Sequence, residues 1–143
     1  KAEGTVIIIG GGMVGCETAS LLVESDNKAD QVIVLEMRDR AASDVPPTYR
    51  PFFLARLAKS GVKIETGTTV EAITPEGVRV SQKGTSAFIN GDVIVLATGY
   101  KADRDLARQL EGKVPELYII GDCVEPRTIR EAIEEGFAAG FRV

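Results

Sequence analysis

The stretch Thr5-Val6-Ile7-Ile8-Ile9-Gly10-Gly11-Gly12-Met13-Val14-Gly15-Cys16-Glu17 decides the fold. Its apolar run leads into glycine, and Gly10, Gly12 and Gly15 then follow the spacing G-x-G-x-x-G. This pattern predicts a buried strand, a tight turn and the beginning of a helix. Gly10 would allow the sharp turn, Gly12 would let the backbone approach a pyrophosphate, and Gly15 would let the helix pack closely on the strand. The N-terminus of the helix would then hold the anion.

A second apolar run, Gln31 to Leu35, ends in Glu36, roughly 20 residues beyond the glycine loop. A carboxylate at this tip of a strand can accept hydrogen bonds from the ribose of an adenosine. Three spaced glycines alone are weak evidence for a nucleotide, and Glu36 alone could simply solvate the end of a strand. Strand, glycine loop, helix, strand and acid together predict a dinucleotide site.

Composition narrows the class of protein. The chain has 143 residues, of which 44% are hydrophobic and 27% charged, as is usual for one globular domain. The net charge of −4 and the lack of a basic patch argue against a nucleic-acid partner. No apolar run approaches the roughly 20 residues that span a bilayer, and no signal peptide opens the sequence. We therefore expect no membrane partner and a cytoplasmic location.

The cysteines, Cys16 and Cys123, lie far apart without a C-x-x-C pair, and the chain has no histidine. This excludes a dithiol redox centre and any Ser-His or Cys-His couple, and it disfavours a zinc site. We predict no catalytic side chain and no metal ligand, so the chemistry would belong to a cofactor. A helix N-terminus could lower the pKa of the Cys16 thiol, but a small apolar residue packed on the sheet is the simpler interpretation.

Apolar periodicity predicts two helices in the first hundred residues. The first spans Val14 to Glu24, ends at the polar residues Ser25 to Lys28, and would bury Val14, Ala19, Leu21, Leu22 and Val23. The second spans Tyr49 to Ser60 and would bury Phe52, Phe53, Leu54 and Leu57.

Further strands follow the second helix. Val62 to Thr66 reads as a third strand, and alternating runs near 69–73, 77–82 and 86–89 predict an antiparallel meander. The apolar run from Asp92 to Gly99 predicts a return to the central parallel sheet. The expected fold class is α/β, a Rossmann-like three-layer domain with a central parallel sheet and an antiparallel three-strand meander in place of a crossover helix.

Two further motifs are Ala97-Thr98-Gly99 and Leu117-Tyr118-Ile119-Ile120-Gly121-Asp122, an apolar strand ending in Gly-Asp. With them the whole chain resembles the pyridine-nucleotide-binding domain of two-dinucleotide-fold FAD/NAD(P) flavoproteins. The resemblance implies an NAD(P)-binding domain over residues 1–100 and a returning segment of the FAD-binding domain over residues 101–143. It also implies that Asp122 contacts the ribityl chain of FAD. From the residues alone, Asp122 could equally be an exposed carboxylate or the N-cap of a helix that begins near Arg127.

Arg127 and Arg130 stand in the first turn of that last helix. Their spacing to Glu131 and Glu134 predicts ion pairs along the helix surface. A flavin contact from either arginine is the less favoured interpretation.

The segments Gly10 to Glu17 and Val114 to Arg127 look most similar to the C-terminal region of the 2,4-dienoyl-CoA reductase and enoate-reductase-like group, the old-yellow-enzyme-linked NADH:flavin oxidoreductases. This resemblance implies FAD and barrel domains in the same protein, with FMN and room for an iron–sulfur cluster in the missing part. Since the chain begins at Lys1 and shows neither barrel nor first glycine loop, we expect a fragment that is inactive alone. Whether the protein forms a homo-oligomer stays open.

The predicted cofactor-binding residues come from the glycine loop, the end of the second strand and the two further motifs. They are Gly10, Gly11, Gly12, Met13, Val14, Gly15, Glu36, Met37, Arg38, Ala97, Thr98, Gly99, Gly121 and Asp122. The leading hypothesis is an NAD(P)H-binding module that positions nicotinamide for hydride transfer to a flavin. The alternative is a structural or electron-routing domain that holds ADP or NAD without turnover.

NAD(H) is favoured over NADP(H) because the strand fixes Glu36, which would repel a 2′-phosphate. Arg38 and Arg40 could clamp such a phosphate. They lie, however, on a loop rich in Ala, Ser and Pro that we expect to lose entropy on closing.

Overall fold

The computed structural model describes residues 3–24 and 29–143, so the predicted polar helix stop at Ser25 to Lys28 lies outside the described residues. The chain divides into two compact units, a first unit of residues 1–98 and a second unit of residues 99–143, and each is described by itself. Within the described residues, no helix is both long enough and apolar enough to cross a membrane.

The first unit alternates strands and helices before its antiparallel hairpins. Its elements are β1 (Thr5–Ile9), α1 (Met13–Glu24), β2 (Gln31–Leu35), α2 (Arg50–Lys59), β3 (Lys63–Glu65), β4 (Thr68–Thr74), β5 (Gly77–Gln82), β6 (Thr85–Asn90) and β7 (Val93–Leu96). The parallel sheet has the order β3-β2-β1-β7, with β2 and β7 on either side of β1. β4, β5 and β6 form a separate antiparallel sheet.

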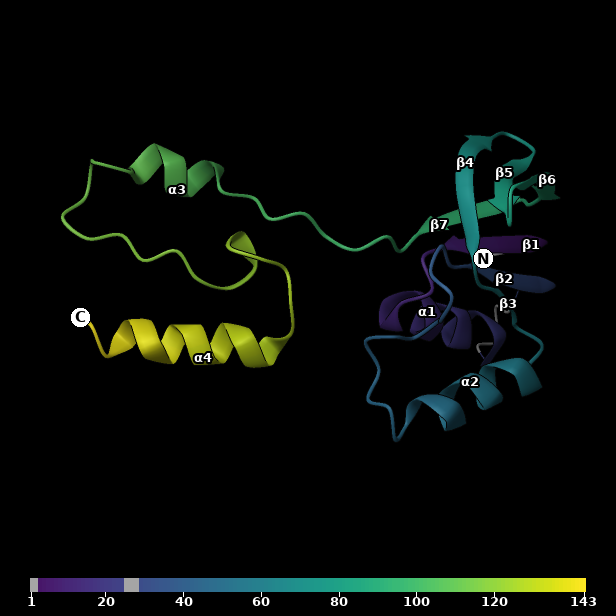
Figure 1. Ribbon diagram of the computed structural model, residues 1–143, viewed down its shortest axis with the longest axis horizontal. Helices are drawn as coiled ribbons and strands as arrows, with labels where there is room; N and C mark the ends of the chain where they lie inside the picture. Colours follow the sequence, from purple (N-terminus) through teal and green to yellow (C-terminus); the bar gives the residue numbers. More distant parts are fainter. Residues whose placement is uncertain (1–2, 25–28) are drawn as a thin grey trace. The chain divides into compact units, whose positions relative to one another are not determined.

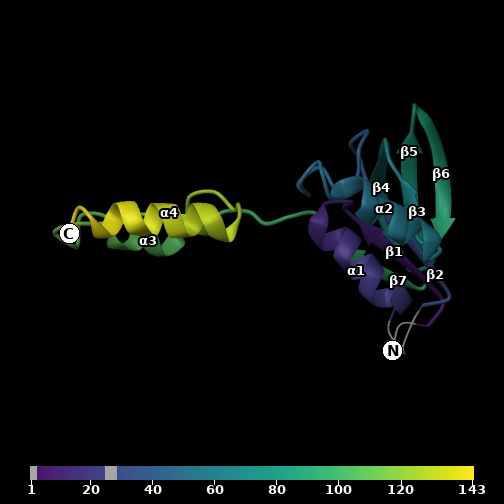
Figure 2. The ribbon, with the colours of Figure 1, turned by 90° about the horizontal axis from the view of Figure 1, so that it is seen from below.

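These elements make three layers. Figure 1 shows α1 and α2 below the parallel sheet and β4, β5 and β6 above it. In the turned view of Figure 2, β5 and β6 run side by side. The Rossmann-like three-layer class with its antiparallel meander is therefore confirmed, and so is the return of β7 to the parallel sheet.

The alternation of side chains along β1 builds two cores. Val6 and Ile8 pack with the helices, whereas Ile7 packs with Val78 and Val80 of the antiparallel sheet. All three β1 side chains are fully buried. Since successive strand residues point to opposite faces, one apolar run can serve both layers.

The buried face of α1 differs from the prediction. The buried residues of this helix are Gly15, Cys16, Ala19 and Ser20. Val14 and Leu21 are 57% and 67% exposed, so their predicted burial is wrong. The helix lies so close to β1 that a Cβ on Gly15 would stand 1.9 Å from the Gly10 carbonyl oxygen. Small side chains therefore occupy the contact.

In α2 the prediction is confirmed for Phe53 and Leu57, which are buried, and for Leu54, which packs against the core. Phe52 is 74% exposed, so its predicted burial is wrong. Successive side chains of a helix point roughly 100° apart. Since Phe53 and Leu57 face the core, the neighbouring Phe52 points away from it.

The second unit holds α3 (Asp105–Leu110), the 3₁₀ turn η1 (Gly121–Cys123) and α4 (Ile129–Gly140). The helix α3 was not predicted. The predicted strand at 117–120 is absent from the described second unit, because this run has no neighbouring strand to pair with there. Its placement in an FAD-binding domain stays a prediction.

The first turn of α4 is capped by Thr128 rather than by Asp122, so the N-cap alternative for Asp122 is wrong. The Thr128 hydroxyl accepts from the Arg130 amide, and the Glu131 carboxylate accepts from the Thr128 amide. The hydroxyl of Thr128 also lowers the pKa of Glu131.

The ion pairs of α4 follow the prediction in part. Arg130 pairs with Glu134 at 2.9 Å, as expected. Arg127 pairs with Glu135 rather than with Glu131, whose carboxylate already serves the helix cap.

Candidate functional site

The glycine loop joins β1 to α1, and two of its glycines are required by the fold. Gly10 has φ 109°, and a Cβ there would lie 2.2 Å from the Ala97 carbonyl oxygen. Gly15 admits no side chain against the Gly10 carbonyl, as described above. These positions therefore have the turn and packing roles that the sequence predicts.

Gly12 is different, because backbone does not crowd it. The nearest atoms to a Cβ at this position are those of the Asp44 carboxylate, at 3.3–3.8 Å. The space in front of Gly12 is therefore free of backbone and is bounded only by the flexible Asp44 carboxylate. Its role in the approach of a pyrophosphate stays a prediction.

Asp44 is the site residue that the sequence analysis missed. It stands in the loop between β2 and α2, and both of its carboxylate oxygens accept from the Met13 amide, at 2.8 Å and 3.0 Å. Met13 is the first residue of α1, where the helix presents amides without intrahelical partners and favours negative charge. At this helix N-terminus, where an anion is expected, the Met13 amide binds the Asp44 carboxylate.

The loop that carries Asp44 is anchored across the glycine loop. The Ala42 amide donates to the Gly11 carbonyl oxygen at 2.6 Å, and Ala41, Ala42 and Val45 are buried. This loop is therefore fixed, contrary to the flexibility that we expected of it. The sequence shows only that Asp44 is acidic. Its spacing from the other motifs does not predict that this loop crosses the N-terminus of α1.

Glu36 lies beneath the glycine loop and is only 8% exposed. One carboxylate oxygen accepts from the Gly11 amide and the other from the Arg38 amide, each at 2.8 Å. The side chain thus joins the tip of β2 to the glycine loop. Each oxygen has a further lone pair that a ribose hydroxyl could use, and this contact stays a prediction.

Met37 and Arg38 follow Glu36 at the rim of the site. Met37 is 70% exposed, and the Arg38 guanidinium donates to the Ser43 hydroxyl at 3.3 Å. The backbone of Arg38 is held on both sides, since its carbonyl also accepts from the Gly67 amide at 2.7 Å. Because its backbone is already held, Arg38 would lose less conformational entropy on clamping a phosphate than the sequence suggests.

Ala97 and Thr98 directly follow β7 and lie beside Gly10 of the glycine loop. The Ala97 amide donates to the Ile9 carbonyl oxygen at 2.8 Å, and its side chain lies beside Gly15. The structure thus brings the glycine loop, Glu36, Arg38 and Ala97 together. Gly99 has φ 88° and opens the second unit.

Cys16 is fully buried, and its thiol donates to the Gly11 carbonyl oxygen at 3.5 Å. Burial raises the pKa of the Cys16 thiol to about 11, with the carboxylates of Asp44 and Glu36 adding to the rise. Such a thiol is not ionised at neutral pH, so Cys16 is a small packing residue.

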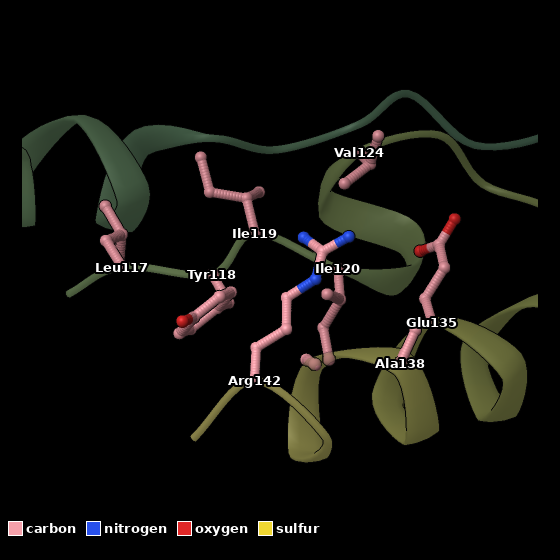
Figure 3. Close-up of a pocket in the computed structure, with 9 residues that line it drawn as sticks. Leu117, Tyr118, Ile119, Ile120, Val124, Glu135, Ala138 and Arg142 are labelled. Atoms are coloured by element: carbon pink, nitrogen blue, oxygen red, sulfur yellow. The ribbon is translucent and has the colours of Figure 1, made fainter.

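Gly121 and Asp122 lie in η1 of the second unit, beside a cavity of about 380 Å³. Figure 3 shows the extended run from Leu117 to Ile120 on one side of this cavity and Glu135 of α4 on the other. The Gly121 amide donates to Glu135 at 2.6 Å, and Asp122 is exposed. This bond and the Arg127 guanidinium lower the pKa of Glu135. The described residues contain no cluster of acids and cysteines that could hold a metal ion.

The family of pyridine nucleotide-disulphide oxidoreductases matches residues 1–136. The chain belongs to this family. The two cysteines of this chain, the buried Cys16 and the half-buried Cys123, are both free.

Similar proteins are much longer. The chain is 35% identical to a metal reductase of Desulforamulus reducens and 35% identical to an NADH oxidase of Thermoanaerobacter brockii, covering 96% of this chain in both cases but 24% and 21% of those proteins. A solved structure of a 2-naphthoyl-CoA reductase complex matches all of the chain with a TM-score of 0.86 and 32% identity, over 22% of that protein. The chain therefore spans about a fifth to a quarter of the length of these relatives.

Proposed function

We propose that this chain is the NAD(P)H-binding module of a flavin-dependent oxidoreductase, and that it positions nicotinamide for hydride transfer to a flavin held by the same protein. One observation carries the proposal. The Met13 amide at the N-terminus of α1 already binds the Asp44 carboxylate, and this carboxylate lies in front of Gly12, where backbone atoms leave space. A pyrophosphate needs the same donor and the same free approach.

The named relatives support this proposal. An NADH oxidase and a 2-naphthoyl-CoA reductase each contain a region similar to the whole chain. We further propose that the parent protein belongs with the 2,4-dienoyl-CoA reductase and enoate-reductase-like flavoproteins, works in the cytoplasm, and supplies FAD and barrel domains as partners of this module.

The residues have distinct proposed roles. Residues 10–15 would bind the pyrophosphate through backbone amides, and Glu36 would accept from the adenosine ribose. Ala97 and Thr98 would bound the site from β7, while Asp122 would contact FAD. When bound, the nicotinamide supplies the hydride and the flavin accepts it, so the side chains of this module bind and orient and none acts as an acid or base.

We propose NADH as the preferred reductant. Glu36 is fixed by two backbone amides, so its negative charge cannot move away from a 2′-phosphate. Arg38 already donates to Ser43, and that contact must be given up before the guanidinium can clamp a phosphate.

The test uses the complete flavoprotein that contains this chain, under anaerobic conditions. Mixing with NADH should bleach the flavin absorbance, and NADPH should do so less efficiently. Glu36→Ala should reduce the difference between the two reductants, and Asp39→Asn, which removes an exposed charge from the neighbouring loop, is the matched control. Binding of NADH without bleaching would favour the alternative, a domain that holds the nucleotide without turnover.

A further inference from the structure

We propose that Asp44 is an internal competitor of the dinucleotide, whose carboxylate occupies the pyrophosphate position and must leave it before the ligand binds. This inference rests on the proposed dinucleotide site. It adds a residue that sets the affinity of the site for pyrophosphate and thereby distinguishes ligands with a pyrophosphate from ligands without one.

Two contacts of the Asp44 carboxylate place it in front of the glycine loop. The Met13 amide donates to both carboxylate oxygens of Asp44, at 2.8 Å and 3.0 Å. The same carboxylate also supplies the three nearest atoms to a Cβ on Gly12. The Met13 amide and the space in front of Gly12 therefore face the same anion, and this anion is the carboxylate of Asp44.

The carboxylate can leave without opening the loop. Asp44 lies in a tight turn, in which the Val45 amide donates to the Ala42 carbonyl oxygen at 3.1 Å. This turn is held by the bond from the Ala42 amide to Gly11 and by the burial of Ala42 and Val45. A rotation of the exposed Asp44 side chain is therefore sufficient to free the Met13 amide.

Electrostatics makes the exchange necessary. Asp44 and Glu36 both act on the Cys16 thiol in the first turn of α1, so two carboxylates already converge on this helix N-terminus. A pyrophosphate placed beside Asp44 would add like charge at contact distance. The single N–H of Met13 is already shared by both Asp44 oxygens, so a phosphate oxygen would have to compete with this carboxylate for it.

The experiment compares dissociation constants for ADP-ribose, NADH and adenosine by calorimetry, with wild type, Asp44→Asn and Asp44→Ala. We expect Asp44→Ala to bind ADP-ribose and NADH roughly tenfold more tightly, the size of one charge-assisted hydrogen bond that no longer has to be broken. Asp44→Asn should gain less, because its amide oxygen can still accept from the Met13 amide although the charge is gone. Adenosine, which lacks phosphate, should change by less than about twofold. Asp39→Asn removes an exposed charge from the same loop and should leave all three constants within about twofold.

Each other outcome has a distinct meaning. Wild-type binding of ADP-ribose with no gain in folded Asp44→Ala would overturn this inference alone, as would an equal gain for adenosine, which would indicate a loop effect. No binding of any dinucleotide to wild type or variants would overturn the proposed function as well. A crystal structure with ADP-ribose should show Asp44 turned away from the Met13 amide, and a carboxylate still bonded there would contradict the exchange.

Discussion

At the scale of single residues, the three spaced glycines have two kinds of purpose. Gly10 and Gly15 are fixed by backbone: a side chain at either would meet a carbonyl oxygen at about 2 Å. Gly12 meets only the end of the Asp44 side chain, at 3.3 Å. One motif therefore combines two positions that the fold requires with a third that backbone does not crowd and that the proposed ligand would use.

This difference predicts opposite outcomes for two substitutions. Gly15→Ala should lower the free energy of unfolding by at least about 2 kcal/mol, because the helix must move off β1. Gly12→Val should leave the thermal unfolding transition near that of wild type but abolish measurable binding of ADP-ribose, because the side chain fills the approach to the Met13 amide. If folded Gly12→Val protein bound ADP-ribose with wild-type affinity, the glycine loop would not be part of the dinucleotide site.

The sequence reveals Glu36 but not Asp44, for a physical reason. Glu36 follows a strand whose apolar pattern fixes its register, so its place at the tip of β2 can be predicted. Asp44 reaches α1 only because Ala42 bonds to Gly11 across the sequence, and the conformation of a loop does not follow from periodicity. The pattern also cannot show that the two amides of Gly11 and Arg38 are the partners of Glu36.

At the scale of elements, strands were easier to predict than helix faces. The apolar runs of β1 and β7 predict strands of the central parallel sheet, and their parallel pairing is confirmed. The faces of α1 follow a different rule, because its axis lies so close to β1 that glycine, alanine, serine and cysteine form the contact. Val14 and Leu21 were therefore assigned to the wrong side, whereas Leu22 and Val23 pack against the core as predicted. The apolar run at 117–120, which precedes Gly121 and Asp122, does not form the predicted strand, because the described second unit has no neighbouring strand for it to pair with.

The capping box of α4 is an element whose contribution can be measured. Thr128→Ala should destabilise the helix by about 1 kcal/mol, because the amides at its N-terminus lose their acceptor. Thr128→Ser, which keeps the hydroxyl, is the matched control. Amide exchange of α4 should accelerate in the alanine variant alone, and equal acceleration in both variants would assign the effect to the lost methyl group.

At the scale of the whole molecule, the two units differ in how much apolar surface they bury. The first unit has two buried clusters on the two faces of its parallel sheet. The helices described in the second unit contain no buried residue. Ile129, Phe137 and Phe141 of α4 and its C-cap remain 69–80% exposed. Since burial of apolar surface is the dominant favourable contribution to folding, the stability of the chain should come from the first unit.

A chain shortened to residues 1–98 tests this division together with the proposed site. Among the described residues, the partners that hold the glycine loop by hydrogen bonds all belong to the first unit: Leu35, Glu36, Ala42, Asp44 and the Cys16 thiol. The shortened chain should therefore unfold cooperatively within a few degrees of the 143-residue chain and bind ADP-ribose within about twofold of its affinity. In the 143-residue chain, amides of α4 should exchange with solvent much faster than those of β1, because their opening exposes little new apolar surface. Loss of ADP-ribose binding by a folded 1–98 protein would show that residues beyond Thr98 complete the site, and the glycine loop would then not be sufficient to hold the dinucleotide.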